Sequence, residues 1–106
     1  MEYVGKAIFD FSIEGEIVNV DDIQKSIGKC KNKIVVLKDA TPDIILLYRE
    51  IKGVICERGG ITCHLSILSR EMSIPCVVGV KDATHIKNGT YIRIRVIDGV
   101  GYINEI

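Results

Sequence analysis

Residues 53–72 read GVICERGGITCHLSILSREM, and this stretch decides the fold that we expect for the whole chain. Its first four residues are small or apolar, as in a buried strand. The pair Gly59 and Gly60 then frees the backbone for a tight connection. The apolar, polar-interrupted run that follows is expected to form a helix that ends before Pro75. The sequence therefore predicts a strand–glycine–helix junction, with His64 in the first turn of the helix.

The start of a helix is a favourable place for an anion. Its first N–H groups have no partner inside the helix, and they carry partial positive charge. Phosphate is well suited to such a place. Thr62 is a competent N-cap, and a neutral imidazole at His64 can attack phosphorus. A lone histidine beside an apolar helix is more often a packed or surface residue, but the glycines and the threonine favour a nucleophile that receives a phosphoryl group.

The chain has 106 residues, of which 47% are hydrophobic, and we expect one domain spanning residues 1–106. Branched aliphatic residues dominate, which favours strands over a helical bundle. Residues 12–14 read as a break between the first two strands. The patterns predict strands at 4–9, 15–20, 34–37, 53–56, 75–80, 91–96 and 101–106, and helical segments at 21–27, 43–49 and 63–72. The fold class is therefore a compact α/β domain.

Charge and hydropathy exclude several classes of partner. Fourteen basic and fourteen acidic residues give a formal net charge of zero, so long-range attraction to nucleic acid or to an anionic membrane is not expected. No apolar run approaches the roughly 20 residues that span a bilayer. The first residues lack the basic and apolar regions of a signal peptide. We expect a cytoplasmic protein with no nucleic-acid or membrane partner.

The four cysteines show no metal-binding spacing, because none forms a Cys-x-x-Cys pair. They are Cys30, Cys56, Cys63 and Cys76. Nothing else in the sequence suggests secretion, so reduced thiols and no metal site are expected. Cys63 is interpreted as a small packed residue rather than a nucleophile.

A longer pattern surrounds His64 and resembles the phosphohistidine signature of phosphoenolpyruvate-utilising enzymes. This family includes pyruvate phosphate dikinase, phosphoenolpyruvate synthase and enzyme I of the sugar phosphotransferase system. The similarity extends over roughly residues 10–106. The residues that carry it are Gly59-Gly60-Ile61-Thr62-Cys63-His64, Ile67, Arg70-Glu71 and Ile74-Pro75-Cys76-Val77-Val78-Gly79, with Asp39-Ala40-Thr41-Pro42-Asp43 and Gly53-Val54-Ile55 upstream and Asp82-Ala83-Thr84, Asn88-Gly89 and Asp98-Gly99-Val100-Gly101 downstream.

The resemblance implies a swivelling β/β/α domain that carries a phosphoryl group on His64. Gly59 and Gly60 would shape the phosphate loop, with Cys63 beside it, and Thr62 matches a threonine that regulatory proteins modify in the dikinase and synthase branches. The domain itself would bind no cofactor. ATP and Mg²⁺ would belong to an ATP-grasp-type nucleotide-binding partner, and pyruvate or a similar acceptor to a phosphoenolpyruvate/pyruvate barrel, so the chain would be an incomplete phosphotransferase component.

Two other functions stay open. Neither partner domain is expected within these 106 residues, and Leu65-Ser66 stands where the family usually has two alanines. Both observations would suit a non-catalytic docking or regulatory module that keeps the fold. The carrier domain of an antibiotic-directed phosphotransferase, similar to rifampicin phosphotransferase, is the third hypothesis.

Four other charged or titratable residues receive structural interpretations. Arg70 lies about 240° round the helix from His64, so a helix-end position or a core ion pair is expected rather than a phosphate contact. His85 is expected at the surface. Arg93 and Arg95 are expected on the exposed face of their strand, without a ligand.

Overall fold

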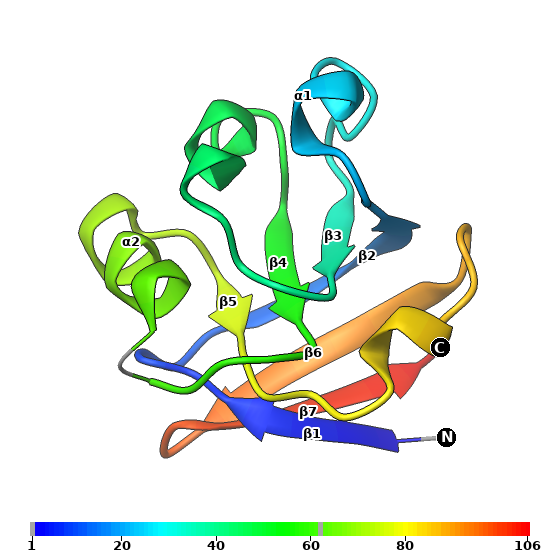
Figure 1. The fold of residues 1–106 in the computed structure, drawn as a ribbon. Coiled ribbons are helices and arrows are strands. Elements are labelled where there is room, and N and C mark those ends of the chain that lie inside the picture. Colours follow the sequence, from blue (N-terminus) through cyan, green and yellow to red (C-terminus); the bar gives the residue numbers. More distant parts are fainter. Residues whose placement is uncertain (1, 62) are drawn as a thin grey trace.

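The strands form a seven-stranded sheet in the order β1-β7-β6-β2-β3-β4-β5 (Figure 1) in the computed structural model, which describes residues 2–61 and 63–106. β2 is antiparallel to β6 and parallel to β3, so it joins an antiparallel half to a parallel half. The elements, with η for a short 3₁₀ helix, are β1 (Glu2–Lys6), β2 (Ser12–Asn19), α1 (Ile23–Ser26), β3 (Ile34–Leu37), η1 (Pro42–Leu47), β4 (Gly53–Cys56), α2 (His64–Met72), β5 (Cys76–Val77), η2 (Ala83–His85), β6 (Tyr91–Ile97) and β7 (Val100–Glu105).

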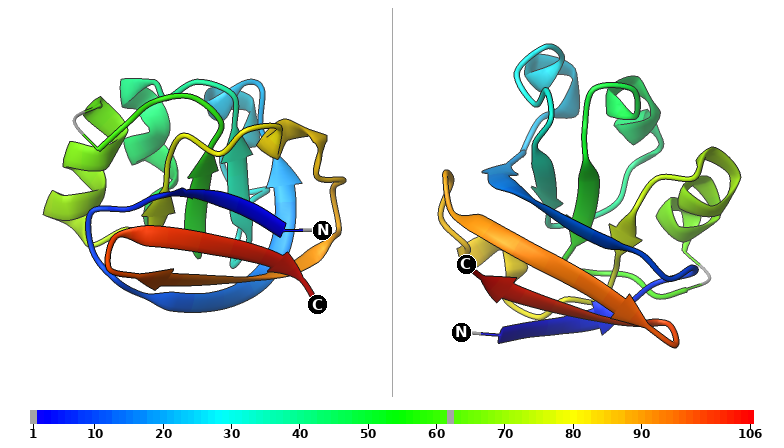
Figure 2. Two further views of the ribbon diagram at one scale, coloured as in Figure 1. Left: turned by 90° about the horizontal axis from the view of Figure 1, so that it is seen from below. Right: turned by 180° about the vertical axis from the view of Figure 1, so that it is seen from behind.

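The two halves of the sheet lie face to face, and α1, η1 and α2 cover the outer side of the parallel half (Figures 1 and 2). Side chains of β3 alternate between two cores. Ile34 and Val36 join the core between the halves, whereas Val35 and Leu37 join the core under the helices, which also holds Leu65 of α2. Because both faces of β3 are buried, its sequence is continuously apolar. The predicted β/β/α layering is confirmed.

The antiparallel half has one buried and one exposed face, as the alternation in the sequence predicts. Ile92 and Ile94 of β6 are buried against the parallel half. Arg93 and Arg95 point to the other side and are exposed, which confirms that both lie on the exposed face of their strand. Among the described residues, no helix covers the outer face of this half (Figure 2).

A short bridge joins the two edge strands of the sheet. Lys6 N–H donates to the Val78 carbonyl oxygen at 2.9 Å, and Val78 N–H donates to the Lys6 carbonyl oxygen at 2.8 Å. The strands approach closely here, since a Cβ on Gly5 would lie 2.6 Å from Val77 Cγ1. Only a hydrogen atom fits at Gly5.

The predicted break at residues 12–14 is wrong, because these residues form the first part of β2. Glu14 lies opposite Arg93 of β6, and its carboxylate accepts a hydrogen bond of 2.8 Å from Arg93 Nε. The polar character of this segment reflects its exposed strand face rather than a turn. The chain instead bends between Ala7 and Phe11.

Two further boundaries differ from the expectation. The segment expected as a helix over 43–49 is the 3₁₀ helix η1, with Ile44 and Leu47 both buried. A spacing of three residues suits 3.0 residues per turn, so the same buried face forms on the tighter helix. The strand expected over 75–80 pairs with β4 only at Cys76 and Val77, because Val78 turns to the bridge with β1.

Candidate phosphohistidine site

His64 is the first residue of α2 and its side chain is exposed. β4 ends at Cys56, and the loop that follows brings the chain back to the start of the helix. The buried Leu65 anchors this first turn in the core under the helices. His64 is therefore held at a fixed place by its neighbour, while its own ring faces solvent.

The N-cap of α2 is Cys63, not Thr62, because the helix begins one residue later than expected. Cys63 has extended backbone with φ −71° and ψ 162°, and its carbonyl oxygen accepts the first helical hydrogen bond from Ile67 N–H at 3.2 Å. Its side chain makes no capping hydrogen bond. Thr62 lies outside the described residues, so its expected regulatory role stays a prediction.

The loop before His64 is fixed by two hydrogen bonds to one carbonyl oxygen. Gly60 O accepts from Cys63 N–H at 3.0 Å and from the Ser66 hydroxyl at 2.9 Å. Ser66 is buried. The serine that departs from the family pattern therefore ties the helix to the loop, a role that sequence reasoning missed. Its position two residues after the histidine was the available signal.

Gly79, which follows β5, packs against the loop that precedes His64. Gly59 has φ +108°, and Gly79, just after β5, has φ +66°. A Cβ on Gly79 would lie 3.0 Å from the Gly59 carbonyl oxygen. The predicted loop glycines thus differ in role, since Gly59 needs its left-handed backbone, whereas a Cβ on Gly60 would meet open space.

Cys63 is the cysteine whose surroundings lower the pKa of its thiol. Burial raises the pKa of this half-buried thiol, but the Ser66 hydroxyl and nearby amides favour the thiolate more, so the pKa falls below its usual value. The Ser66 hydroxyl oxygen lies 3.5 Å from Cys63 Sγ. By contrast, burial raises the pKa of Cys56 to about 11 and raises that of Cys76 as well. All four cysteines have free thiols.

Arg70 is exposed in the last turn of α2, so the helix-end expectation is correct. The alternative of a core ion pair is wrong. The ion pairs found within residues 2–61 and 63–106 are Lys33–Glu16, Arg58–Asp39 and Arg93–Glu14. Arg70 instead lines a groove with Ile8 and Ile61.

Glu57 links the site loop to η2. Its carboxylate accepts from Thr84 N–H at 3.0 Å and from the Thr84 hydroxyl at 2.8 Å. These bonds lower the pKa of Glu57, the backbone bond most. The next residue, Arg58, forms an ion pair with Asp39, which follows β3, and Arg58 Nη1 lies 3.4 Å from Asp39 Oδ1. The ends of β3 and β4 and the η2 turn are thus held together beside the loop.

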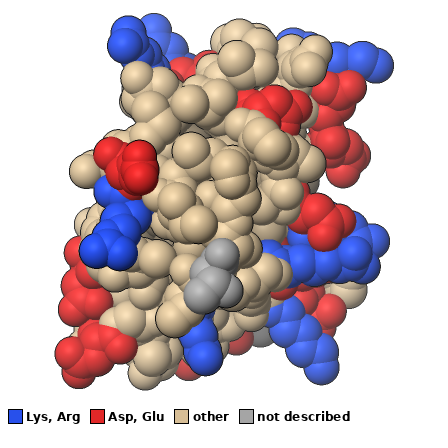
Figure 3. Space-filling view, turned by 60° about the vertical axis from the view of Figure 1, so that its left-hand side comes forward, with Lys and Arg blue, Asp and Glu red and all other residues tan. Residues whose placement is uncertain are grey.

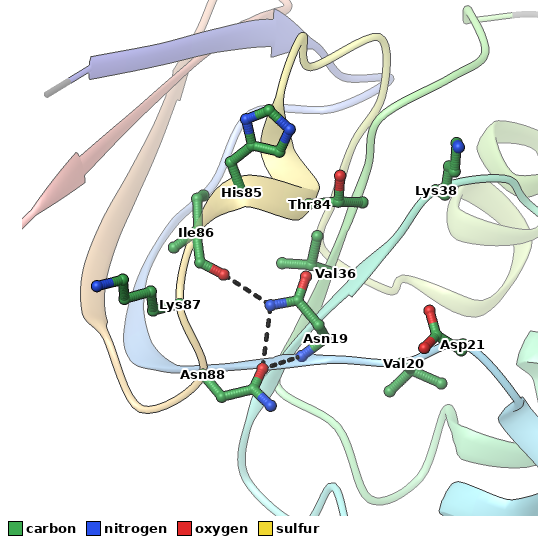
Figure 4. Close-up of a pocket in the computed structure, with 10 residues that line it drawn as sticks. All are labelled: Asn19, Val20, Asp21, Val36, Lys38, Thr84, His85, Ile86, Lys87 and Asn88. Carbon is green, nitrogen blue, oxygen red and sulfur yellow. Dashed lines mark hydrogen bonds between the residues drawn. The ribbon is translucent and has the colours of Figure 1, made fainter.

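A cavity of about 440 Å³ lies at the carboxyl ends of β2 and β3, and none of the predicted site residues lines it (Figure 4). Asn88 Oδ1 accepts from the Asn19 backbone N–H at 2.7 Å and from Asn19 Nδ2 at 3.0 Å. Asn19 Nδ2 also donates to the Ile86 carbonyl oxygen. His85 is exposed, as expected, and its ring points away from Asn19 in Figure 4. This asparagine pair fastens β2 to the turn before β6.

Within residues 2–61 and 63–106, no three His, Cys, Asp or Glu side chains converge as the ligands of a metal ion would. No helix in the same residues combines the length and hydropathy that a bilayer crossing needs.

The layered β/β/α fold, with a histidine at its glycine–helix junction, is that of the swivelling-domain class. A model of the family described as "PEP-utilising enzyme, mobile domain" matches residues 29–99. The chain belongs to this family.

Its relatives include a probable phosphoenolpyruvate synthase of Methanothermobacter thermautotrophicus, 44% identical over 71 residues that cover 67% of this chain and 10% of that protein. The phosphoenolpyruvate synthase of Pyrococcus furiosus is 33% identical, covering 83% of this chain and 11% of that protein. That of Escherichia coli is 32% identical, covering 93% and 13%. The chain therefore spans only 10–13% of the length of these relatives.

Solved structures agree with this fold. An NMR structure of Enzyme I superposes with a TM-score of 0.60 at 28% identity, covering 74% of this chain and 33% of that chain. Aconitase X of Thermococcus kodakaraensis superposes with a TM-score of 0.71 at 17% identity, covering 99% of both chains. At that identity the second likeness concerns the fold alone.

Proposed function

We propose that this domain is a phosphoryl carrier in which His64 accepts a phosphoryl group from a donor derived from ATP or phosphoenolpyruvate. It would pass the group to pyruvate or a similar acceptor. The observation that supports this most is the exposed ring of His64 at the first turn of α2, in a chain of the mobile-domain family. The relatives named as phosphoenolpyruvate synthases supply the choice of donor and acceptor.

The transfer proceeds as two displacements at phosphorus. A lone pair on an imidazole nitrogen attacks, and the bond from phosphorus to the leaving oxygen of the donor breaks, with its electrons leaving on that oxygen. An acceptor oxygen then attacks the same phosphorus, and the P–N bond returns its electrons to the ring. The positive end of α2 favours the anionic phosphoryl group while it is carried.

The partners in this proposal are other domains or subunits. An ATP-grasp-type domain would hold ATP and Mg²⁺, and a barrel would hold phosphoenolpyruvate or pyruvate. The matched segment is only 10–13% of the length of these relatives, and their remaining length is sufficient for additional domains, which supports this choice of partners. This chain would then be one component of a phosphotransferase, because it contributes the carrier histidine.

The test is to label the protein with ³²P in the presence of a truncated synthase. By this we mean the Methanothermobacter thermautotrophicus or Pyrococcus furiosus relative from which the matching segment has been deleted. Labelled ATP and labelled phosphoenolpyruvate serve as donors. We expect an acid-labile label on the wild-type chain and none on His64→Ala. His85→Ala is the matched control, because it removes the only other histidine, which is also exposed.

The unfolding free energy of His64→Ala should stay within about 0.5 kcal/mol of wild type, as is usual for an exposed position. A folded wild-type chain that takes no label from either donor with either truncated synthase would overturn the proposal. Label that persists in His64→Ala would also overturn it, because another residue would then be the acceptor.

A further inference from the structure

An apolar groove runs beside the site, between α2 and the segment that connects β1 to β2. It consists of two adjoining cavities of about 530 and 540 Å³, which share Ile8, Ile61 and Arg70. The groove residues are Ala7, Ile8, Phe9, Ile61, Ile67, Arg70, Glu71 and Ser73. Aliphatic and aromatic side chains form most of its wall, and its charged residues are Arg70, which lines both cavities, and Glu71.

Two large side chains of this groove are unusually open to solvent. Ile61 is 51% exposed and Ile67 is 49% exposed. Ile45 and Leu46 of η1, which packs on α2, are exposed as well. The face of the molecule around α2 has an uncharged centre with charged side chains around its rim (Figure 3). An exposed apolar patch with a polar rim is typical of a protein–protein contact.

The groove lies next to the proposed acceptor. Ile67 follows His64 by three residues on α2, so their side chains are neighbours on one helix face. A protein interface of standard size covers about 800 Å² on each partner. A patch of that area centred on His64 has a radius of roughly 16 Å, which is about three helix turns. Any protein that delivers phosphorus to the His64 ring must therefore cover Ile67 too.

We propose that this groove is the docking surface for the protein domain that exchanges phosphoryl groups with His64. The partner inserts an uncharged apolar side chain against Ile61 and Ile67 and sets a carboxylate opposite Arg70. This inference rests on the proposed function. The uncharged face and the location beside His64 favour an apolar protein surface over a charged one, and Arg70 has no ion-pair partner among the described residues.

The test substitutes glutamine for the two isoleucines, because a new charge beside His64 would itself repel phosphate. The double variant Ile61→Gln/Ile67→Gln is compared with Ile27→Gln, whose isoleucine is 51% exposed beside α1. Two donors are used for each protein. Potassium phosphoramidate is a small donor that needs no docking surface, whereas a truncated synthase with labelled phosphoenolpyruvate needs one.

For the double variant we expect an unchanged rate with phosphoramidate and a rise of about tenfold in the truncated synthase concentration needed for half-maximal labelling. Ile27→Gln should match wild type with both donors. Equal synthase-driven labelling of wild type and the double variant would overturn the docking surface and leave the carrier function standing. Loss of phosphoramidate labelling would overturn it too, since the isoleucines would then act on the ring.

Two other results bear on the occupant. If sedimentation shows a dimer of wild type that the double variant abolishes, the groove belongs to a second copy and the proposal is overturned. If neither labelled ATP nor labelled phosphoenolpyruvate labels any protein, including wild type, with either truncated synthase, while phosphoramidate labels His64, the carrier function and the docking surface fail together.

Discussion

The substitution Gly79→Ala should displace the loop before His64, although Gly79 itself lies outside that loop. Gly79 has φ +66°, and a Cβ there would lie 3.0 Å from the Gly59 carbonyl oxygen. An ordinary contact is about 3.4 Å, so the loop must move by about 0.4 Å. A left-handed backbone also costs an alanine about 1–2 kcal/mol.

The matched control is Gly89→Ala. Gly89 has φ +88°, but its Cβ would meet nothing within 4 Å. Both variants should therefore lose about 1–2 kcal/mol in urea unfolding, whereas only Gly79→Ala moves the carbonyl of Gly59. Since a displacement of 1 Å can cost about 100-fold in rate, a shift of 0.4 Å predicts a loss of roughly five- to tenfold.

The assay is the initial rate of ³²P transfer to His64 from a truncated synthase, measured for both variants at a temperature where each is folded. A Gly79→Ala protein that transfers as fast as Gly89→Ala would refute the reasoning. So would equal losses in both, because strain alone would then explain the effect.

Two further predictions concern titratable groups near the site. Burial raises the pKa of Cys56 from its usual 9 to about 11, whereas the pKa of Cys63 falls below 9. Because the thiolate is the nucleophile, iodoacetamide should modify Cys63 at least about 100-fold faster than Cys56 at neutral pH. Faster modification of Cys56 than of Cys63 in peptide mass spectra would contradict this. The bonds from Thr84 hold the pKa of Glu57 below its usual 4.5, so the stability they add is fully present above pH 4.5 and is lost as the pH falls through the folded-state value. The difference in unfolding free energy between wild type and Glu57→Gln should thus be constant from pH 7 to about 5 and shrink by pH 3, and a difference equal at pH 3 and pH 7 would count against it.

Local sequence patterns were sufficient to predict the strands whose residue pattern follows directly from the burial of their faces. β3 is apolar throughout because both of its faces are buried, and β6 alternates because one of its faces is. The first part of β2 escaped detection for a non-local reason. Its Glu14 has a partner in Arg93, 79 residues away, and no window of sequence around residue 14 contains that information.

The site divides in the same way. His64 and the loop glycines are predicted as site residues from a contiguous motif with a physical rationale. The hydrogen bond from Ser66 to the Gly60 carbonyl oxygen depends on how the loop folds back. Whether Arg70 forms an ion pair depends on which carboxylates reach it, and none does among residues 2–61 and 63–106. Neither can be read from spacing alone. The N-cap moved from Thr62 to Cys63 because a helix boundary read from sequence is uncertain by a residue or more.

The sharing of β2 between the two halves has a practical consequence for anyone who expresses this domain. The segment that matches the family, residues 29–99, contains the parallel strands β3, β4 and β5 but, of the antiparallel half, only β6. A protein cut at those limits would keep its histidine and lose β1, β2 and β7, and with them most of the layer that shields Ile34 and Val36 from water. The segment that matches the family is therefore shorter than the segment that is needed to form the complete folded domain.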